Sequence, residues 1–229
     1  MPQQLVFDLP HRSAQGADDF LVSASNQAAV DLIDAWPEWP APASIITGPP
    51  GVGKTHLVNV WAERSHAKRM SAIDLTPEHA REVQTILIDG GTLAVEDIDR
   101  GVGSESDLFH LLNLAREHGR SLLLTTRLAP GELGLQLADL SSRLRALPLA
   151  QIDAPDDRLL QALLVKLFND RQLRVEPATV SYILTHMERS AESAARIVAE
   201  IDRLALTTHR RATKLLAREV IYNLFPIKH

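Results

Sequence analysis

The feature that most constrains this chain is a glycine-rich segment that lies between an apolar run and a helix-forming run. Its eight residues are, in order, Gly48, Pro49, Pro50, Gly51, Val52, Gly53, Lys54 and Thr55. Residues 44–47 before it are mostly apolar and β-branched, and residues 55–61 after it have helical character. Strand, glycine loop and helix in this order form the arrangement that cradles phosphate groups. The sequence therefore predicts a nucleotide-binding loop in an α/β fold.

The residue types of this loop suit a phosphate ligand. Gly51 and Gly53 let backbone N–H groups approach phosphate oxygens without a Cβ in the way, and the positive end of the following helix faces the anion. Lys54 would reach the β and γ phosphates, and the Thr55 hydroxyl would bind Mg²⁺. We therefore expect ATP or ADP with Mg²⁺ as cofactors. The alternative is a Gly/Pro surface turn that contains a lysine by chance, which the flanking strand and helix disfavour.

Composition excludes several classes of protein. The 229 residues, 45% hydrophobic and 23% charged, suit one medium domain or one domain with a small satellite. There is no cysteine, which excludes disulfides and thiolate metal sites and favours a reducing compartment. No apolar run is long enough to cross a bilayer, and the N-terminus lacks the pattern of a signal peptide. A net charge of −5 argues against a large nonspecific nucleic-acid surface. We therefore expect a cytoplasmic protein without a membrane partner.

Strand and helix patterns divide the chain into three parts. Residues 1–18 lack a core pattern and are expected to form a flexible N-terminal segment. Residues 19–153 alternate between the two patterns, which predicts a three-layer sandwich with a mainly parallel sheet. Its expected strands are 44–47, 70–74, 93–95, 121–125 and 147–152, and its expected helices include 25–35, one from Pro77 and 107–118. Residues 154–229 show only helical patterns, with starts near 157, 177, 190 and 213, and predict a small all-helical lid domain.

Polar side chains follow two of the predicted strands. Glu96 and Asp97 end the strand at 93–95 and would lie at the carboxyl edge of the sheet, beside the phosphates. One acid can hold Mg²⁺ through water while the other polarises the attacking water. Surface acids would be the preferred interpretation of this segment in isolation, but beside an intact loop we favour the functional one. Thr126 could hydrogen-bond the γ-phosphate or the attacking water, although threonine is common at strand ends.

Two arginines are candidates for stabilising charge on a transferring phosphate, a task for which the guanidinium is well suited. They are Arg143, in the segment 141–145, and Arg196, in the segment 194–197. From spacing alone, a solvated surface position is the better interpretation of either one.

Three segments together resemble the AAA+ module of DnaA, the bacterial replication initiator. They are residues 53–57, the acid pair at 96 and 97, and residues 109–120. The resemblance runs from about Asp19 to residue 225, which is nearly the whole chain. It implies the P-loop NTPase fold of AAA+ proteins, with a parallel sheet followed by a helical lid.

The same resemblance assigns roles to single residues. The segment 19–22 with Asn26 is similar to the adenine-side segment of the family, which places Phe20, Leu21 and Asn26 at the base. The segment 142–144 resembles the arginine-finger box, which makes Arg143 a residue that acts in trans. Arg196 falls close to the second-sensor arginine.

The two ends of the chain distinguish it from the initiator. DnaA carries a helix-turn-helix DNA-binding domain after its lid, and we expect this chain, with 229 residues, to lack one. Near the N-terminus, Gln4, Leu5, Phe7 and Leu9 resemble the short peptide that docks into the hydrophobic pocket of the DNA polymerase III sliding clamp. A tail without function, or a strand that docks on the core, is the alternative. An AAA+ module with a clamp peptide and no DNA-binding domain resembles the Hda family.

The resemblance to the Hda family implies a regulator of replication initiation. Such a protein docks on the sliding clamp and stimulates hydrolysis of DnaA-bound ATP, with DNA contacted only through the clamp. Glu96 stands where the initiator usually has aspartate, and Thr126-Arg127 replaces a polar-acid pair, so we expect at most a weak ATPase. Nucleotide-dependent self-association is a further expectation. Two other classes remain open: a DNA-remodelling ATPase such as a helicase loader, and a small-molecule P-loop kinase.

Overall fold

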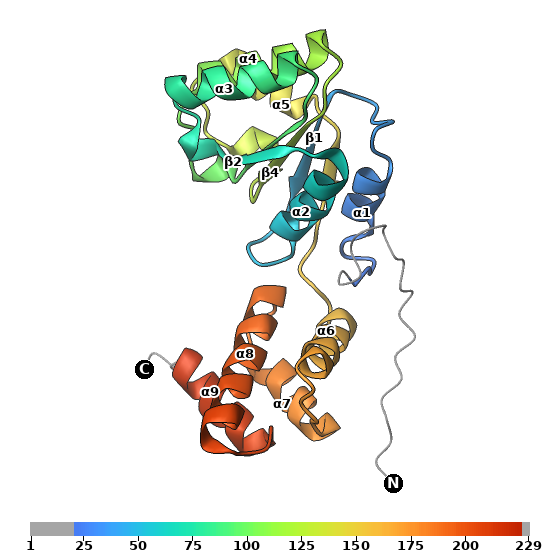
Figure 1. The fold of residues 1–229 in the computed structure, drawn as a ribbon, viewed down its shortest axis with the longest axis vertical. Coiled ribbons are helices and arrows are strands. Elements are labelled where there is room, and N and C mark those ends of the chain that lie inside the picture. Colours follow the sequence, from blue (N-terminus) through green and yellow to red (C-terminus); the bar gives the residue numbers. More distant parts are fainter. Residues whose placement is uncertain (1–20, 226–229) are drawn as a thin grey trace. The chain divides into compact units, whose positions relative to one another are not determined.

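The structure is a computed structural model that describes residues 21–225 of the chain. Within this range the chain forms two compact units (Figure 1). One unit contains residues 26–153, and the other contains residues 154–225 together with the short segment 21–25. Each unit has an apolar core of its own. No helix between residues 21 and 225 is both long and apolar enough to cross a membrane.

The α/β unit is built on a five-stranded parallel sheet in the order β2-β3-β4-β1-β5. The strands are β1 (Ala43–Thr47), β2 (Lys68–Ser71), β3 (Leu93–Glu96), β4 (Leu122–Thr126) and β5 (Leu149–Gln151). Every residue of β1 and β4 is buried, as expected for strands covered on both faces. Because all five strands are parallel, their carboxyl ends lie at one edge of the sheet, and the glycine loop follows β1 at that edge.

Helices cover both faces of this sheet and complete three layers (Figure 1). One layer contains α1 (Gln27–Asp34) and α2 (Lys54–Ser65). The other contains α3 (Pro77–Ile88), α4 (Glu105–Glu117) and α5 (Ala138–Arg145). Helix α5 escaped the sequence analysis because only two of its eight residues, Leu140 and Leu144, are buried. That is too short an apolar pattern to indicate a helix.

Several predicted boundaries differ from the structure: the helix expected at 25–35 is Gln27–Asp34, and the strand expected at 147–152 is Leu149–Gln151. Two further differences have a local cause. Helix α4 begins at Glu105 rather than 107, because the Ser104 hydroxyl accepts a hydrogen bond from the Asp107 N–H and starts the helix earlier. The strand expected at 70–74 occupies Lys68–Ser71 instead, because the chain leaves the sheet in a 3-10 turn, Ala72–Asp74. A side-chain cap in the first place and a 3-10 turn in the second thus shift the element by two or three residues.

The three tryptophans of the chain form one cluster beside α2. Trp61 is fully buried, and the Trp39 ring stacks on it with centroids 5.4 Å apart. Trp36 meets Trp61 edge-on at 6.3 Å. The indole N–H of Trp36 donates to Ser121 Oγ at 2.9 Å, and that of Trp39 donates to Leu32 O at 2.6 Å. The cluster therefore packs the segment after α1 against α2, the helix that follows the glycine loop.

The helical unit consists of α6 (Asp157–Asp170), α7 (Pro177–His186), α8 (Ala191–Thr208) and α9 (Lys214–Leu224). Its core is mainly apolar, with Phe168 and Ile197 completely buried. The helices start where the sequence indicates. Side chains of Asp156, Ser190 and Thr213 accept hydrogen bonds from the first turns of α6, α8 and α9.

The cap of α8 provides a test of the helical unit. Ser190 Oγ accepts the Ser193 N–H at 3.0 Å, and Ser190→Ala leaves that donor without its side-chain partner. We expect this change to lower the free energy of unfolding by about 1 kcal/mol, measured by urea denaturation followed by circular dichroism. Ser190→Asp, which keeps a capping oxygen, is the matched control. Equal midpoints for the alanine variant and the wild type would contradict the assignment.

Candidate functional site

The glycine loop has the backbone geometry of a phosphate cradle. Gly51 has a φ of +71° and Gly53 a φ of +106°, in the left-handed region that favours glycine. Gly53 is also the residue that caps the start of α2. At Gly48 a Cβ would lie 2.3 Å from the Ile152 carbonyl oxygen, so no other residue fits there without movement of the backbone. The loop therefore presents backbone N–H groups at the start of a helix, where anions bind.

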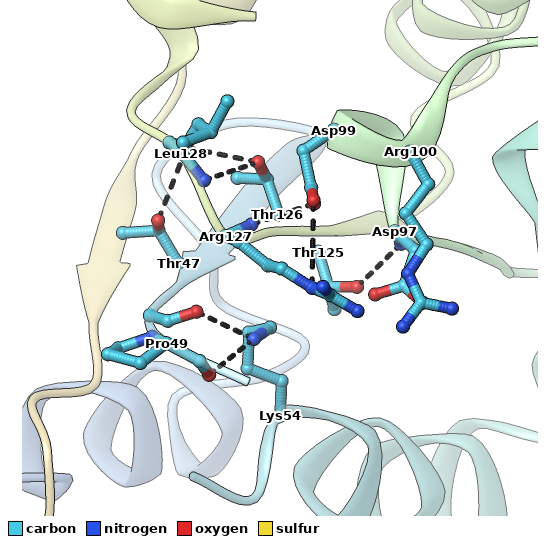
Figure 2. A network of polar contacts seen from close by, with 11 residues as sticks. Thr47, Pro49, Lys54, Asp97, Asp99, Arg100, Thr125, Thr126, Arg127 and Leu128 are labelled. Atoms are coloured by element: carbon cyan, nitrogen blue, oxygen red, sulfur yellow. Dashed lines mark hydrogen bonds and ion pairs between the residues drawn. The ribbon is translucent and has the colours of Figure 1, made fainter. Parts of the chain in front are cut away.

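Lys54 places its ammonium group inside the loop. Its Nζ donates to the carbonyl oxygens of Gly48 at 2.7 Å and Pro49 at 2.9 Å (Figure 2). The residue is 7% exposed, and burial lowers the pKa of Lys54 while the nearby carboxylates of Asp97 and Asp99 oppose that shift. A buried cation with only neutral hydrogen-bond partners favours an anionic ligand, because a phosphate supplies the opposite charge that compensates for desolvation.

Asp97 stands at the carboxyl end of β3 in an unusual conformation. Its φ of +59° and ψ of +45° are left-handed, which aspartate tolerates better than most residues. Its N–H donates to Thr125 Oγ1 at 3.0 Å, and its Oδ2 lies 3.4 Å from Arg100 Nε. Backbone strain of this kind gathers at functional sites. Asp97 thus lies within electrostatic reach of Lys54, at the edge of the sheet where the sequence places it.

Thr126 directs its hydroxyl into the turn that follows β4. Its Oγ1 donates to the Leu128 carbonyl at 3.0 Å and accepts the Leu128 N–H at 3.1 Å. Thr47 Oγ1 donates to the same carbonyl at 3.3 Å. The contact between Thr126 and a phosphate stays a prediction. The hydroxyl that bonds to Asp97 is that of the preceding residue, Thr125.

The sequence analysis missed an ion pair at this edge of the sheet. Asp99 Oδ1 accepts the Arg127 N–H at 2.8 Å, and Asp99 Oδ2 lies 3.6 Å from Arg127 Nε (Figure 2). The Asp99 side chain is only 7% exposed. In the sequence, Asp99 follows Asp97 by two residues. This third carboxylate near the end of β3 was the signal that could have indicated a further charged residue at the site. Asp99 thereby adds a buried negative charge that raises the pKa of Lys54, and Arg100 acts on Lys54 in the opposite direction.

Glu96, the other acid of the pair, already has a cationic partner. Its Oε1 accepts hydrogen bonds from Arg69 Nε at 3.1 Å and Nη2 at 2.7 Å, and the same guanidinium also bonds to Asn59 Oδ1. No group of three or more His, Cys, Asp or Glu side chains within residues 21–225 is placed to hold a metal ion. Thr55, the other expected Mg²⁺ ligand, is exposed on the first turn of α2. Glu96 therefore fits a Mg²⁺ site poorly, and its role as a metal ligand stays a prediction.

The two candidate arginines lie against aromatic rings. Arg143 is on α5, with its guanidinium carbon 5.8 Å from the centroid of Phe109 on α4. Arg196 is on α8 of the helical unit, 5.8 Å from the centroid of Phe225. Both distances are within the range of cation–π attraction. Their observed partners are thus residues other than those of the glycine loop, and their roles at a phosphate stay predictions.

The remaining expected binding residues are only partly described. Asn26 is buried at the start of α1 in the α/β unit, whereas Leu21 belongs to the other unit. Phe20 and the residues of the expected clamp peptide, Gln4, Leu5, Phe7 and Leu9, lie outside the described residues.

Comparison with known sequences gives remote relatives. No protein-family model matches the chain. The chain is 22% identical over 188 residues to an uncharacterized protein of Haemophilus influenzae, covering 79% of this chain and 81% of that protein. It is 27% identical over 199 residues to the chromosomal replication initiator protein DnaA of Thermomicrobium roseum, covering 77% of this chain and 42% of DnaA. The chain thus spans less than half the length of that initiator.

Comparison with solved structures shows the fold. Domain III of DnaA from Thermotoga maritima matches with a TM-score of 0.72 at 16% identity, over 90% of this chain and 95% of that one. AMPPCP-bound DnaA from Aquifex aeolicus matches at 0.70 and 18%, over 82% and 65%. The RuvB branch migration motor of T. maritima matches at 0.69 and 16%, over 88% and 68%. The predicted fold class is confirmed: the chain has the AAA+ fold, with a five-stranded parallel sheet and a C-terminal helical unit.

Proposed function

We propose that this chain is a nucleotide-binding AAA+ regulator of bacterial replication initiation. The observation that carries the proposal is the glycine loop with the ammonium of Lys54 buried inside it, next to the strained acid Asp97. DnaA domain III shares this fold, and the A. aeolicus DnaA structure holds the ATP analogue AMPPCP. ATP or ADP therefore binds at residues 48–55, with its phosphates at the first turn of α2.

The regulated reaction, in this proposal, is hydrolysis of ATP bound to DnaA. Arg143 on α5, which lies 5.8 Å from the centroid of the Phe109 ring, supplies the guanidinium. An arginine supplied in trans accelerates such reactions strongly. Hydrolysis by this chain itself is weak, because Glu96 is paired with Arg69. Its own nucleotide acts as a ligand that shapes the AAA+ surface. Docking on the sliding clamp through Gln4, Leu5, Phe7 and Leu9 brings the protein to DnaA, with DNA contacted through the clamp.

The experiment uses DnaA loaded with labelled ATP, the sliding clamp loaded on DNA, and this protein with ADP or ATP. Conversion of DnaA-bound ATP to ADP is expected to accelerate only when clamp and protein are both present. An unchanged rate would overturn the proposal. Salt-sensitive binding of single-stranded DNA without any effect on DnaA-bound ATP would instead favour a DNA-remodelling ATPase.

Substitution of two residues in the expected clamp peptide tests the docking step. The double variant Gln4→Ala/Leu5→Ala is expected to lower affinity for the clamp by about 10-fold or more, because a few anchoring side chains dominate such small interfaces. The clamp-dependent hydrolysis rate should fall with it and recover at high protein concentration. Gln3→Ala, one residue earlier, is the matched control and should bind normally. Unchanged clamp affinity in the double variant would show that docking uses another part of the chain.

A further inference from the structure

Three side chains from three elements meet beside α2, the helix that follows the glycine loop. Arg69 on β2 bonds through two nitrogens to Glu96 Oε1 and through the third to Asn59 Oδ1 on α2. The register of the parallel pair β2–β3 sets Arg69 opposite Ala94, two residues before Glu96, so that the guanidinium reaches the acid along the same face of the sheet. The contact is thus built by the strand pairing and does not depend on a mobile loop.

The cluster lies on the side of the site where the terminal phosphates are expected. Asn59 follows Thr55 by four residues on α2, so the two side chains share one side of the helix, one turn apart. Glu96 directly precedes Asp97, whose carboxylate acts on Lys54. The Arg69 guanidinium therefore bonds to a side chain that lies one helical turn after Thr55, whose hydroxyl the sequence analysis assigns to Mg²⁺.

The charge balance of this cluster differs from that of a magnesium site. Mg²⁺ keeps most of its waters and is held by one or two carboxylates together with substrate phosphates. Here the Glu96 side chain is 14% exposed, and its charge is already neutralised by a guanidinium that is itself 37% exposed. A divalent cation would lose the attraction of Glu96 and would also face the positive charge of Arg69.

We propose that Arg69 takes the place of the divalent cation beside Glu96, and that this chain binds its nucleotide with little dependence on Mg²⁺. The inference rests on the proposed nucleotide binding at residues 48–55 and concerns the regulation of that same site. Guanidinium groups are always charged, so the site carries its positive charge at all times and releases no metal with the nucleotide. A site of this kind suits a nucleotide that is retained as a structural ligand and not turned over.

The test is a titration of fluorescent ADP in excess Mg²⁺ and in EDTA. For the wild type we expect affinities that agree within about 3-fold between the two buffers, below the 5- to 150-fold range typical of coupled sites. Arg69→Ala frees Glu96 for the metal, so its affinity in Mg²⁺ should exceed that in EDTA by about 10-fold or more. Arg69→Lys keeps a positive charge and should stay close to the wild type. Arg81→Ala removes an exposed arginine from α3 and is the matched control.

The outcomes separate this inference from the proposed function. In one outcome, the wild type and Arg69→Ala both bind ADP more weakly in EDTA than in Mg²⁺ by about 10-fold or more, which is the lower part of the usual coupling range. That result would overturn the role of Arg69 and leave nucleotide binding intact. Absence of ADP binding to the wild type in both buffers would overturn the proposed function itself. Circular dichroism of each variant excludes misfolding. Glu96→Gln, which removes the acid and keeps the shape of the side chain, should be insensitive to Mg²⁺ even when combined with Arg69→Ala.

Discussion

Arg143→Ala is expected to lower the stimulated hydrolysis of DnaA-bound ATP by about 10³-fold, the lower end of the effect of an arginine supplied in trans. Nucleotide binding by this chain should be unchanged, because Arg143 contacts Phe109 on α4 and not the glycine loop. The measurement is the rate at which labelled ATP on DnaA becomes ADP on clamp-loaded DNA. Arg143→Lys should recover little, since lysine keeps the charge but lacks the planar fork of donors.

Arg145 provides a matched control for this prediction. It is exposed on the same helix two residues further on, and it bonds through Nε to the Ser141 carbonyl at 3.3 Å. Residues two apart on a helix do not share a face, so Arg145→Ala should leave the stimulated rate within about 3-fold of the wild type. Equal rates for Arg143→Ala and the wild type would show that another group stabilises the transferring phosphate.

Lys54→Ala is expected to abolish the stabilisation of the chain by nucleotide. Loss of the charged hydrogen bonds from Lys54 to phosphate oxygens of ADP, each worth about 1.5–3 kcal/mol, should weaken ADP binding by about 10²-fold or more. Thermal shift measures this directly, because a ligand at 100 times its Kd stabilises a protein by about 2.7 kcal/mol. The midpoint of the wild type should rise with ADP, whereas that of the variant should stay constant.

The same variant distinguishes lost binding from lost folding. Burial lowers the pKa of Lys54, so the charged ammonium costs stability in the free protein, and its removal should leave the midpoint without nucleotide close to the wild type or above it. Lys68→Ala, which removes an exposed lysine of β2 paired with Glu82, is the matched control and should keep the full shift. A variant that retains the wild-type shift with ADP would contradict the role of the loop.

Much of the fold was predictable because its signals are local. The loop at residues 48–55 is recognisable from spacing alone, and the structure gives Gly51 and Gly53 the left-handed conformations that the motif requires. The capping side chains of Ser190 and Thr213 indicate the starts of α8 and α9 for the same reason, since each bonds to a residue three positions away. Helix α5 was missed because its stability comes from packing against α4 and not from a pattern of its own.

The candidate site was only partly predictable, because its polar partners are remote in the sequence. Glu96 and Arg69 are 27 residues apart, and Asp99 and Arg127 are 28 apart. Nothing in the local sequence pairs them. They meet because β2 lies beside β3 and β3 lies beside β4, with registers set by the packing of the sheet against two layers of helices.

The sequence by itself determined the phosphate-binding loop, the alternation of strands and helices, and the acids at the end of β3, since these depend on residue types at short spacing. Only the tertiary structure decided which charged side chains lie next to those acids. Glu96 is paired with the Arg69 guanidinium and Asp97 lies near Lys54, because strand order and register place Arg69 next to Glu96 and the glycine loop near Asp97. Electrostatic energy depends on distances in space, and those distances exist only after the sheet has formed.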